Sequence, residues 1–114
     1  MNTSDCLFCK VLERKIPAKV EYEDDKLLAF YDINPQAPVH LLLVPKKHIE
    51  KISDLEENHI ALTGSLIYKA ARIAEKNHWT DYRLVFNNGA QAGQSVFHIH
   101  LHLLSGRKMR WPPG

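Results

Sequence analysis

This sequence has few cysteines, little net charge and no long apolar run. Two of its 114 residues are cysteines, and its formal net charge at pH 7 is +2. Two cysteines are too few for the disulfide framework of a small secreted domain. The net positive charge is small, and the basic cluster near the C-terminus is too weak a bias to indicate nucleic-acid binding. The longest apolar stretch, HLLLVP, is far too short to cross a bilayer, so neither nucleic acid nor a membrane is an expected partner.

A signal peptide is also missing from the start of the chain. The stretch MNTSDCLFCK contains no apolar core of the kind that such peptides carry, which favours a cytoplasmic protein. With 114 residues and 45% hydrophobic content, the chain fits one globular domain over residues 1–114. We expect residues 1–5 to be flexible and residues 106–114, which end in WPPG, to form an extended tail.

The two cysteines form a C-x-x-C pair, Cys6 and Cys9. In a reducing compartment a structural disulfide is not expected. Thioredoxin-type redox chemistry places such a pair directly after a strand in a βαβ unit, and no strand signal precedes this pair. A metal site is the favoured interpretation, and two small buried thiols on a helical turn are the alternative.

Periodicity and turn signals predict an α+β domain. A short N-terminal helix is expected to start from Ser4 or Asp5 as its cap. A capping box of Ser53 and Glu56, followed by apolar residues at helical spacing, predicts one long helix to about Asn77. Because nearly all connections are short, the sheet should be mostly antiparallel with the long helix on one face. The expected strands are residues 19–25, 27–33, 40–45, 81–87 and the histidine-bearing run from 97 to 103.

That last run, FHIHLHL, places His98, His100 and His102 at alternate positions. Successive side chains of a strand point to opposite faces, so the three imidazoles should share one face. Phe97, Ile99, Leu101 and Leu103 should then pack into a core on the other face.

The shared imidazole face could bind a metal, serve only the structure, or act in catalysis. One metal ion cannot take all three rings, because the outer two leave a strand about 13 Å apart. A metal held by two of them with a further ligand, or three histidines with only a structural role, remain as alternatives. The favoured use is nucleophilic catalysis, since a neutral imidazole attacks phosphorus without a separate base and departs again in a second step.

Such chemistry needs donors for a phosphate, and the loop GAQAGQS lies directly upstream of the histidines. Its residues Gly89, Gly93, Gln94 and Ser95 are expected to turn backbone N–H groups toward the anion, with the Ser95 hydroxyl as a further donor.

The histidine run matches the histidine triad (HIT) motif. The similarity continues in IPAKVEYEDD, AFYDINPQAPVHLLLVPKKHI, YRLVFNNGAQAGQSVFHIHLHLLSGR and WPPG. Over almost its whole length the chain resembles the Hint branch of the HIT superfamily, the purine nucleoside phosphoramidases. The resemblance implies an α+β HIT fold in which the sheet continues across a homodimer. It also implies hydrolysis of purine nucleoside 5′-phosphoramidates to a nucleoside monophosphate plus an amine, through a nucleotidyl-histidine intermediate.

The resemblance also implies roles for single residues. His100 corresponds to the nucleophile, and His40 and His102 to histidines that orient it and handle protons near the leaving amine. Ser95 corresponds to a contact of the phosphate and the leaving group, and Asp32 to the carboxylate that accepts both ribose hydroxyls. The other nucleotide-binding positions are Asn87 at the phosphate, and Phe8 and Ile33 beside the base.

For the cysteines, the resemblance implies a structural zinc ion. Its ligands would be Cys6, Cys9, His48 and His98, a closed set of four that leaves no coordination position for water, so catalysis itself needs no cofactor. Trp111 lies in a C-terminal segment that reaches the partner subunit's active site in Hint-like proteins. There it would tune the choice of leaving group, and a tail that merely docks on the dimer is the alternative.

Two rival functions stay open. A Fhit-like dinucleoside polyphosphate hydrolase would use the same nucleophile, but such relatives tend to follow the triad with a proline-containing segment, where this chain has LLSGR. A non-enzymatic nucleotide-binding adaptor is the more distant alternative.

Overall fold

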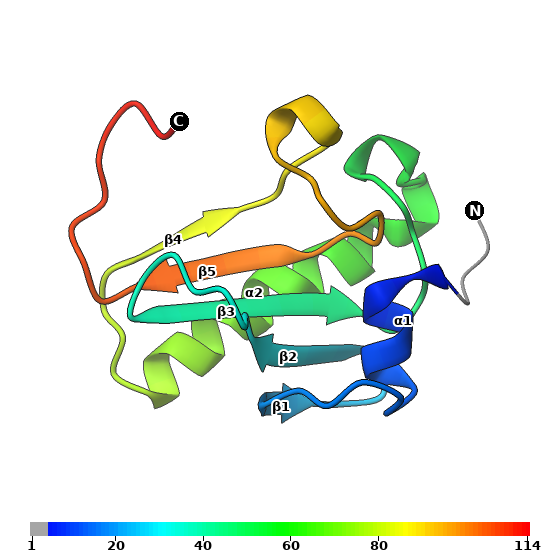
Figure 1. Cartoon of the computed structure of the whole chain (residues 1–114), viewed down its shortest axis with the longest axis horizontal. Coiled ribbons are helices and arrows are strands. Elements are labelled where there is room, and N and C mark those ends of the chain that lie inside the picture. Colours follow the sequence, from blue (N-terminus) through cyan, green and yellow to red (C-terminus); the bar gives the residue numbers. More distant parts are fainter. Residues whose placement is uncertain (1–4) are drawn as a thin grey trace.

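The computed structural model describes residues 5–114. Its sheet has five strands in the spatial order β1-β2-β3-β5-β4, and every neighbouring pair is antiparallel (Figure 1). The expected α+β architecture with a mostly antiparallel sheet is therefore confirmed. The strands are β1 (Val20–Glu23), β2 (Leu27–Tyr31), β3 (Val39–Pro45), β4 (Tyr82–Val85) and β5 (Leu101–Ser105).

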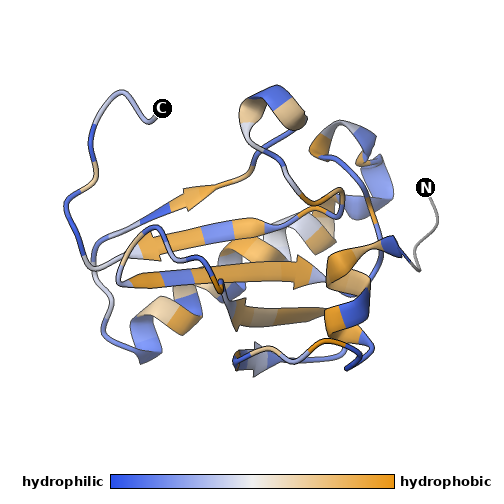
Figure 2. Cartoon of the chain, in the orientation of Figure 1, coloured by the Kyte–Doolittle hydropathy of each residue, from blue (hydrophilic) through white to orange (hydrophobic). Residues whose placement is uncertain are grey.

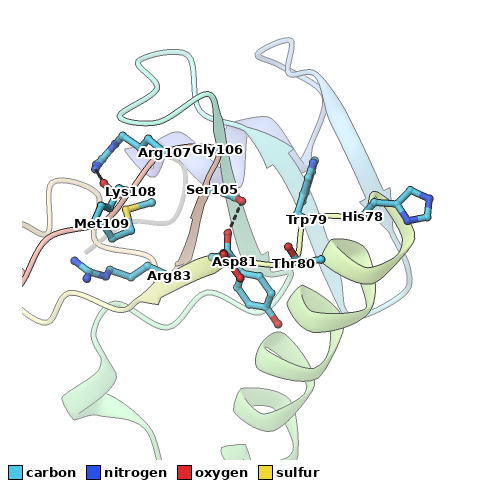
Figure 3. A pocket seen from close by; sticks show the side chains of 11 residues that line it. His78, Trp79, Thr80, Asp81, Arg83, Ser105, Gly106, Arg107, Lys108 and Met109 are labelled. Carbon is cyan, nitrogen blue, oxygen red and sulfur yellow. Dashed lines mark hydrogen bonds between the residues drawn. The ribbon is translucent and has the colours of Figure 1, made fainter.

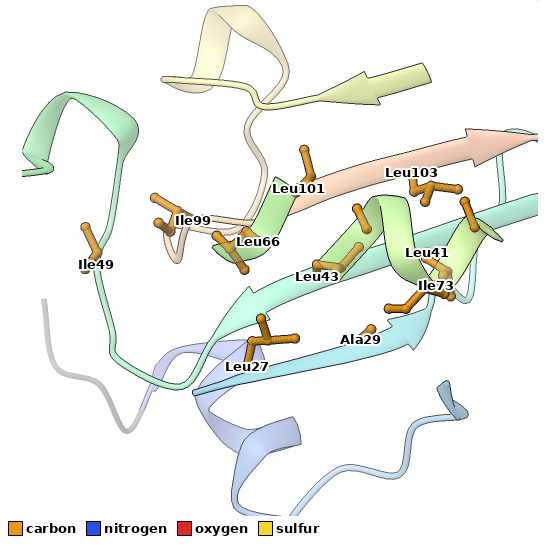
Figure 4. Close-up of a cluster of buried hydrophobic side chains, with 12 residues drawn as sticks. Leu27, Ala29, Leu41, Leu43, Ile49, Leu66, Ile73, Ile99, Leu101 and Leu103 are labelled. Carbon is orange, nitrogen blue, oxygen red and sulfur yellow. The ribbon is translucent and has the colours of Figure 1, made fainter. Parts of the chain in front are cut away.

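Helices cover both faces of this sheet. On one face, α2 (Ile60–Lys76) packs on the side chains that alternate along the central strands, among them Leu41, Leu43 and Leu103 (Figure 4). On the opposite face, α1 (Leu7–Leu12) packs on a second cluster that includes Phe30. Because β2 and β3 are buried on both faces, they are nearly continuous hydrophobic runs, whereas the loops are hydrophilic (Figure 2).

The start of α1 differs from the prediction. Its N-cap is Cys6 rather than Asp5, and the Cys6 sulfur accepts a hydrogen bond from the Cys9 amide at 3.4 Å. The alternative cap, Ser4, lies outside the described residues, as does most of the segment 1–5 expected to be flexible. The cysteine thus has a local task in folding besides any metal chemistry.

The long helix also begins later than predicted. The segment that was expected to open it forms two 3-10 turns, Ile52–Asp54 and Glu57–His59, and α2 starts only after them. The capping box is built by Glu56 and His59, while the Ser53 amide instead donates to the side chain of Asn88 at 2.8 Å. The predicted end is confirmed, since Asn77 is the C-cap.

The histidine run is only partly a regular strand. Ladder pairing of β5 begins at Leu101, and the preceding residues arrive through turns. His98 and His100 nevertheless lie on the α1 face, where their ring centroids are 6.0 and 4.9 Å from that of Phe8. Of the four residues expected on the α2 face, Ile99, Leu101 and Leu103 belong to that core, and Phe97 does not. The alternation therefore extends beyond the paired strand, although less far than predicted.

After β5 the chain has no further helix or strand in residues 106–114. Two hydrogen bonds attach this segment to the domain: Arg83 donates to the Arg110 carbonyl at 2.9 Å, and Arg107 donates to the Gln36 carbonyl at 2.9 Å. Among the described residues, no helix has the length and apolar character needed to span a membrane.

The alternation of β5 can be tested with adjacent leucines. Leu103 is fully buried in the α2 core, while Leu104 is partly exposed on the other face. We expect Leu103→Ala to lower the free energy of unfolding by about 2 to 5 kcal/mol, because it leaves a cavity in that core. Leu104→Ala should cost clearly less, as measured by urea denaturation. Equal losses would contradict the assignment of faces.

Candidate functional site

Four potential metal ligands converge where α1 meets the end of β3 and the approach to β5. Cys6, Cys9, His48 and His98 each direct one ligand atom into a cluster in which all four atoms lie within 4.8 Å of one another. The sulfur-to-nitrogen distances are 3.4, 3.5 and 3.7 Å, and the two Nδ1 atoms of the histidines are 3.1 Å apart. A tetrahedral zinc ion with bond lengths of about 2.3 Å to sulfur and 2.05 Å to nitrogen would set these separations at about 3.6 and 3.3 Å.

The protonation of His98 fits the same role. Its Nε2 lies 2.7 Å from the Pro45 carbonyl, which can only accept, so Nε2 carries the proton and Nδ1 carries a lone pair. That lone pair points at the Nδ1 of His48 and at both sulfurs. Two sulfurs and two imidazole nitrogens at these distances can act together as the ligands of one cation. The four side chains therefore fit a tetrahedral metal ion such as zinc.

The ionisable groups of this cluster are tuned by burial. Burial, reinforced by a hydrogen bond and charge from Cys6, raises the pKa of Cys9 to about 11. Burial lowers the pKa of His98 to about 4, so its ring is neutral at pH 7. A metal ion would bind the neutral imidazoles directly and would displace the thiol protons.

The middle histidine has a separate environment. The Nδ1 of His100 lies 2.8 Å from the carbonyl oxygen of His98, so Nδ1 carries the proton and donates it. The lone pair of the ring is then on Nε2. Burial lowers the pKa of His100, against the opposing effects of this hydrogen bond and of Asp32. The ring is thus held as a neutral base whose free nitrogen is not used by the metal cluster.

Beside it, His40 and His102 form a directed chain of hydrogen bonds. The amide of Gln36 donates to the Nδ1 of His40 at 3.0 Å, which leaves the proton of His40 on Nε2. That Nε2 lies 2.9 Å from the Nδ1 of His102 and donates to it. The proton of His102 is consequently on its own Nε2, a buried atom without a protein partner among the described residues. This series of hydrogen bonds therefore ends at the Nε2–H of His102, a donor without a partner. The ring centroids of His102 and His100 are 4.8 Å apart.

The same tautomers bear on a second possible metal site. Asp32, His40 and His102 also bring ligand atoms within 4.8 Å of one another. His40 cannot supply a lone pair there, however, because its Nδ1 accepts from Gln36 and its Nε2 carries the proton. This arrangement favours a proton relay over metal coordination, with the Asp32 carboxylate 3.5 Å from the Nε2 of His40.

A cavity of about 370 Å³ opens in front of these rings. One wall is apolar and comes from α1, the segment after it and β2. The other wall is polar and carries His100, His102, Ser95 and Asp32. Of the nucleotide-binding residues predicted from the sequence, Phe8 and Ile33 also line it, and Ile33 is almost fully exposed at its mouth. The cavity therefore pairs an apolar slot with a set of hydrogen-bonding groups.

The glycine loop contributes less than expected. The amides of Gly93 and Gln94 donate to carbonyls within the loop, and the amide of Gly89 donates to the Gln94 side chain. The Gln94 side chain is buried and also donates to the Glu50 carbonyl at 2.7 Å. Only Ser95 and its neighbour Val96 line the cavity. The loop therefore does not present several amides to a phosphate as expected, and only its C-terminal end faces the cavity.

Two other predicted residues do not line the cavity. Asn87 lies beneath the loop, with its side-chain amide nitrogen 3.4 Å from the position that a Cβ on Gly93 would take. Trp111 is 83% exposed and belongs to the C-terminal segment. That segment instead borders a larger hollow of about 780 Å³ around Arg83 and Ser105 (Figure 3), and none of the histidines of the candidate site lines it.

Some groups that orient the side chains of the site could not be predicted from the sequence. Gln36 acts through its backbone amide, and the carbonyls of Pro45 and His98 act as acceptors. Backbone groups are present at every position, so only the fold selects them. The apolar wall could have been found, since Leu7 and Val11 share one side of α1 with Phe8 at helical spacing.

The fold and the site agree with known proteins. The HIT domain family matches residues 13–109, and the chain belongs to this family. A HIT family hydrolase from Legionella pneumophila superposes with a TM-score of 0.93 at 50% identity, covering 96% of this chain and 100% of that one. A zinc-bound histidine triad protein from Mycobacterium smegmatis superposes with a TM-score of 0.80 at 32% identity, covering 94% of this chain and 78% of that one.

Two curated relatives place the chain in the Hint branch. The 14 kDa zinc-binding protein of Zea mays is 47% identical, over 100% of this chain and 91% of its own length. The adenylylsulfatase HINT1 of Arabidopsis thaliana is also 47% identical, over 99% of this chain and 79% of its own length. The expected family and branch are thus confirmed.

The burial of His102 makes stability depend on pH. Burial and the neighbouring charges of His100 and His40 lower its pKa to about 4, whereas an unfolded chain has about 6.5. Between these values the unfolded state binds more protons, so the free energy of unfolding falls as the pH drops from 6.5 to 4. The fall should be smaller in His102→Gln than in the wild type, as measured by urea denaturation at pH 7, 5.5 and 4.5. Parallel curves for the two proteins would contradict this account.

Proposed function

We propose that this protein hydrolyses purine nucleoside 5′-phosphoramidates to a nucleoside monophosphate and an amine. The proposal rests mainly on the free Nε2 of His100, which faces a cavity with an apolar slot. The same cavity contains one proton donor without a partner, the Nε2–H of His102. The base would occupy the apolar wall near Phe8, and the α-phosphate would lie between Ser95 and the imidazoles. The ribose hydroxyls would donate to Asp32 at the mouth.

The reaction proceeds in two displacements. The Nε2 of His100 attacks the α-phosphorus, a P–N bond to the ring forms, and the P–N bond to the leaving amine breaks. The leaving nitrogen takes the proton on the Nε2 of His102, which ends the chain from Gln36 through His40. Water then attacks phosphorus, returns a proton to His102, and the ring of His100 departs with its electron pair.

A second substrate class is favoured by one relative. The Arabidopsis protein is named an adenylylsulfatase, which implies a sulfate leaving group on the same α-phosphorus. Sulfate departs without a proton, so this reaction would need His100 and far less of His102. Rates on a phosphoramidate, an adenylyl sulfate and a diadenosine polyphosphate separate the candidates, and kcat/KM should be highest for the phosphoramidate. Preference for the polyphosphate would instead support the Fhit-like alternative.

A homodimer accompanies this proposal. β4 is an edge strand, so one side of its backbone is unpaired within the chain. The neighbouring helix α2 exposes Ile60, Ile67 and Tyr68 on one stripe at helical spacing. Pairing of two β4 edges would continue the sheet, cover this stripe, and bring the exposed Trp111 toward a second subunit.

The nucleophile can be tested directly. His100→Gly should lower kcat by at least about a hundredfold while AMP still binds, because the covalent route is lost. Wild-type protein mixed rapidly with the phosphoramidate should show an added nucleotidyl mass in intact-mass spectrometry, and the variant should not. Undiminished turnover by His100→Gly would refute the assignment.

The ribose contact gives a second test. Asp32→Ala should raise KM for ribonucleotide substrates about tenfold, because two hydrogen bonds to a carboxylate are lost. The same change should alter KM for the 2′-deoxy analogue much less. A similar rise for both sugars would remove the ribose role from Asp32.

Zinc is the metal we propose for the four-ligand cluster. Purified protein should contain one zinc per chain, and Cys6→Ser should lower both the zinc content and the melting temperature. Serine keeps the N-cap acceptor of α1, so a lost cap does not explain the drop. A chelator should destabilise the wild type and leave the variant unchanged. Wild-type protein free of zinc after expression with ample zinc would contradict the proposal.

A further inference from the structure

A basic hollow of about 370 Å³ lies apart from the histidine cavity, where the end of β3 meets the start of α2. Lys26, Lys46 and Lys47 line it against a single carboxylate, that of Asp25. Lys46 is already paired with Glu23 at 2.9 Å, whereas Lys47 makes no ion pair with a carboxylate of residues 5–114. The hollow therefore carries uncompensated positive charge.

Its floor contains a buried imidazole. His59 is 7% exposed, and its Nδ1 accepts a hydrogen bond from the Glu56 amide at 2.9 Å as part of the capping box. A backbone amide can only donate, so the lone pair is on Nδ1 and the proton of the neutral ring is on Nε2. This Nε2–H is directed toward the hollow that His59 lines.

The group nearest to the Nε2–H of His59 is another hydrogen-bond donor. The Nζ of Lys47 lies 3.1 Å from the Nε2 of His59, and an ammonium group has no acceptor. Two donors therefore meet at this distance, and the Nε2–H of His59, which is more than nine-tenths buried, is left without an acceptor, whereas the exposed Lys47 can donate to solvent. An anionic oxygen that accepts from both would satisfy the buried ring and neutralise Lys47 together.

We propose that this hollow binds a phosphate group, whose oxygens accept from His59 and Lys47, with Lys26 adding positive charge. A tetrahedral oxyanion presents acceptors in several directions, which suits donors on different elements. The Ser65 hydroxyl and the Asn58 amide line the same space and can serve the remaining oxygens. The site does not depend on the reaction assigned to the histidine cavity.

The test is a two-dimensional amide NMR titration of the full chain with inorganic phosphate, after AMP has been added to saturation. We expect the amides of Asn58 and Ser65 to shift in a saturable way. Lys47→Gln should weaken the apparent affinity at least about tenfold, since one charge-assisted hydrogen bond is lost. Lys76→Gln, an exposed lysine in the last turn of α2, should change it less than about twofold.

Three results would overturn the proposal: no saturable shift, shifts confined to Ser95 and its neighbours, or equal weakening by both lysine variants. If AMP itself shifts Asn58 and Ser65, the site is supported and its ligand is a nucleotide phosphate. If AMP leaves the histidine cavity unchanged, the proposed function fails while the phosphate titration of the hollow still decides this inference.

A second inference, which rests on the proposed function, concerns the loop from 32 to 38. The chain that leaves β5 holds this loop at two points. Gly106 has φ +97, and a Cβ there would lie 2.8 Å from the Cβ of Pro38. Next to it, Arg107 donates through Nε to the Gln36 carbonyl at 2.9 Å. The amide of Gln36 is the group that fixes the proton of His40 on Nε2.

The geometry points to Arg107 as a positioning residue for the proton donor. If the Gln36 amide moves away, His40 can carry its proton on Nδ1 and accept from His102 through Nε2. The direction of the chain then reverses, and the Nε2 of His102 no longer has a proton to give. Arg107 thus controls protonation of the leaving group without touching the substrate.

The effect of Arg107→Ala on kcat should therefore depend on the leaving group of the substrate. We expect kcat for an alkyl phosphoramidate to fall about tenfold or more, and kcat for a p-nitrophenyl nucleotide ester, which needs no proton, to change less than about twofold. KM should be nearly unchanged, and Arg72→Ala on α2 serves as the control. An equal fall for both substrates, or no fall, would overturn the inference.

The tautomer supplies a readout that needs no activity. Long-range proton–nitrogen NMR of Arg107→Ala should show the proton of His102 partly or wholly on Nδ1 instead of Nε2. Retention of the wild-type tautomer would overturn the inference even if turnover fell. If wild-type protein hydrolysed neither substrate, the proposed function would fail and this NMR comparison would still decide the role of Arg107.

Discussion

The hydrogen bond from the Nδ1 of His100 to the carbonyl of His98, 2.8 Å long, determines the chemistry of the whole cavity. It places the ring's lone pair on Nε2 and keeps it there, so the nucleophile proposed at this position needs no separate base. The bond exists because ladder pairing begins only at Leu101. In a paired strand a carbonyl points sideways to the neighbouring strand, whereas here it is free to meet a side chain of its own segment.

His98 links this bond to the metal cluster. Its carbonyl accepts from the ring of His100, while its own ring donates to the Pro45 carbonyl and turns Nδ1 toward the two sulfurs. An ion on that nitrogen would fix the same peptide that orients His100. The structural and the catalytic parts of the motif are therefore connected by two bonds of one residue, and neither is independent of the other.

Much of this could be predicted from the sequence, part of it from alternation and spacing and part of it from the resemblance to the HIT family. Alternation and short connections predict the shared face of the histidines and the antiparallel sheet, and the resemblance implies the convergence of Cys6, Cys9, His48 and His98. All three features appear in the structure. The N-cap of the long helix was harder to predict. The polar segment around Ser53 offers several equivalent caps, and tertiary contacts select one of them. The glycine loop was misjudged because its amides satisfy one another, which composition does not reveal.

Backbone groups fix the protons of His100 and His40 directly, and that of His102 through His40, before any substrate arrives. Long-range proton–nitrogen NMR of the wild-type protein near pH 7 reports each tautomer directly. We expect a proton on Nδ1 of His100 and on Nε2 of both His40 and His102, with all three rings neutral. A proton on the Nε2 of His100, or a positively charged ring at that position, would contradict it.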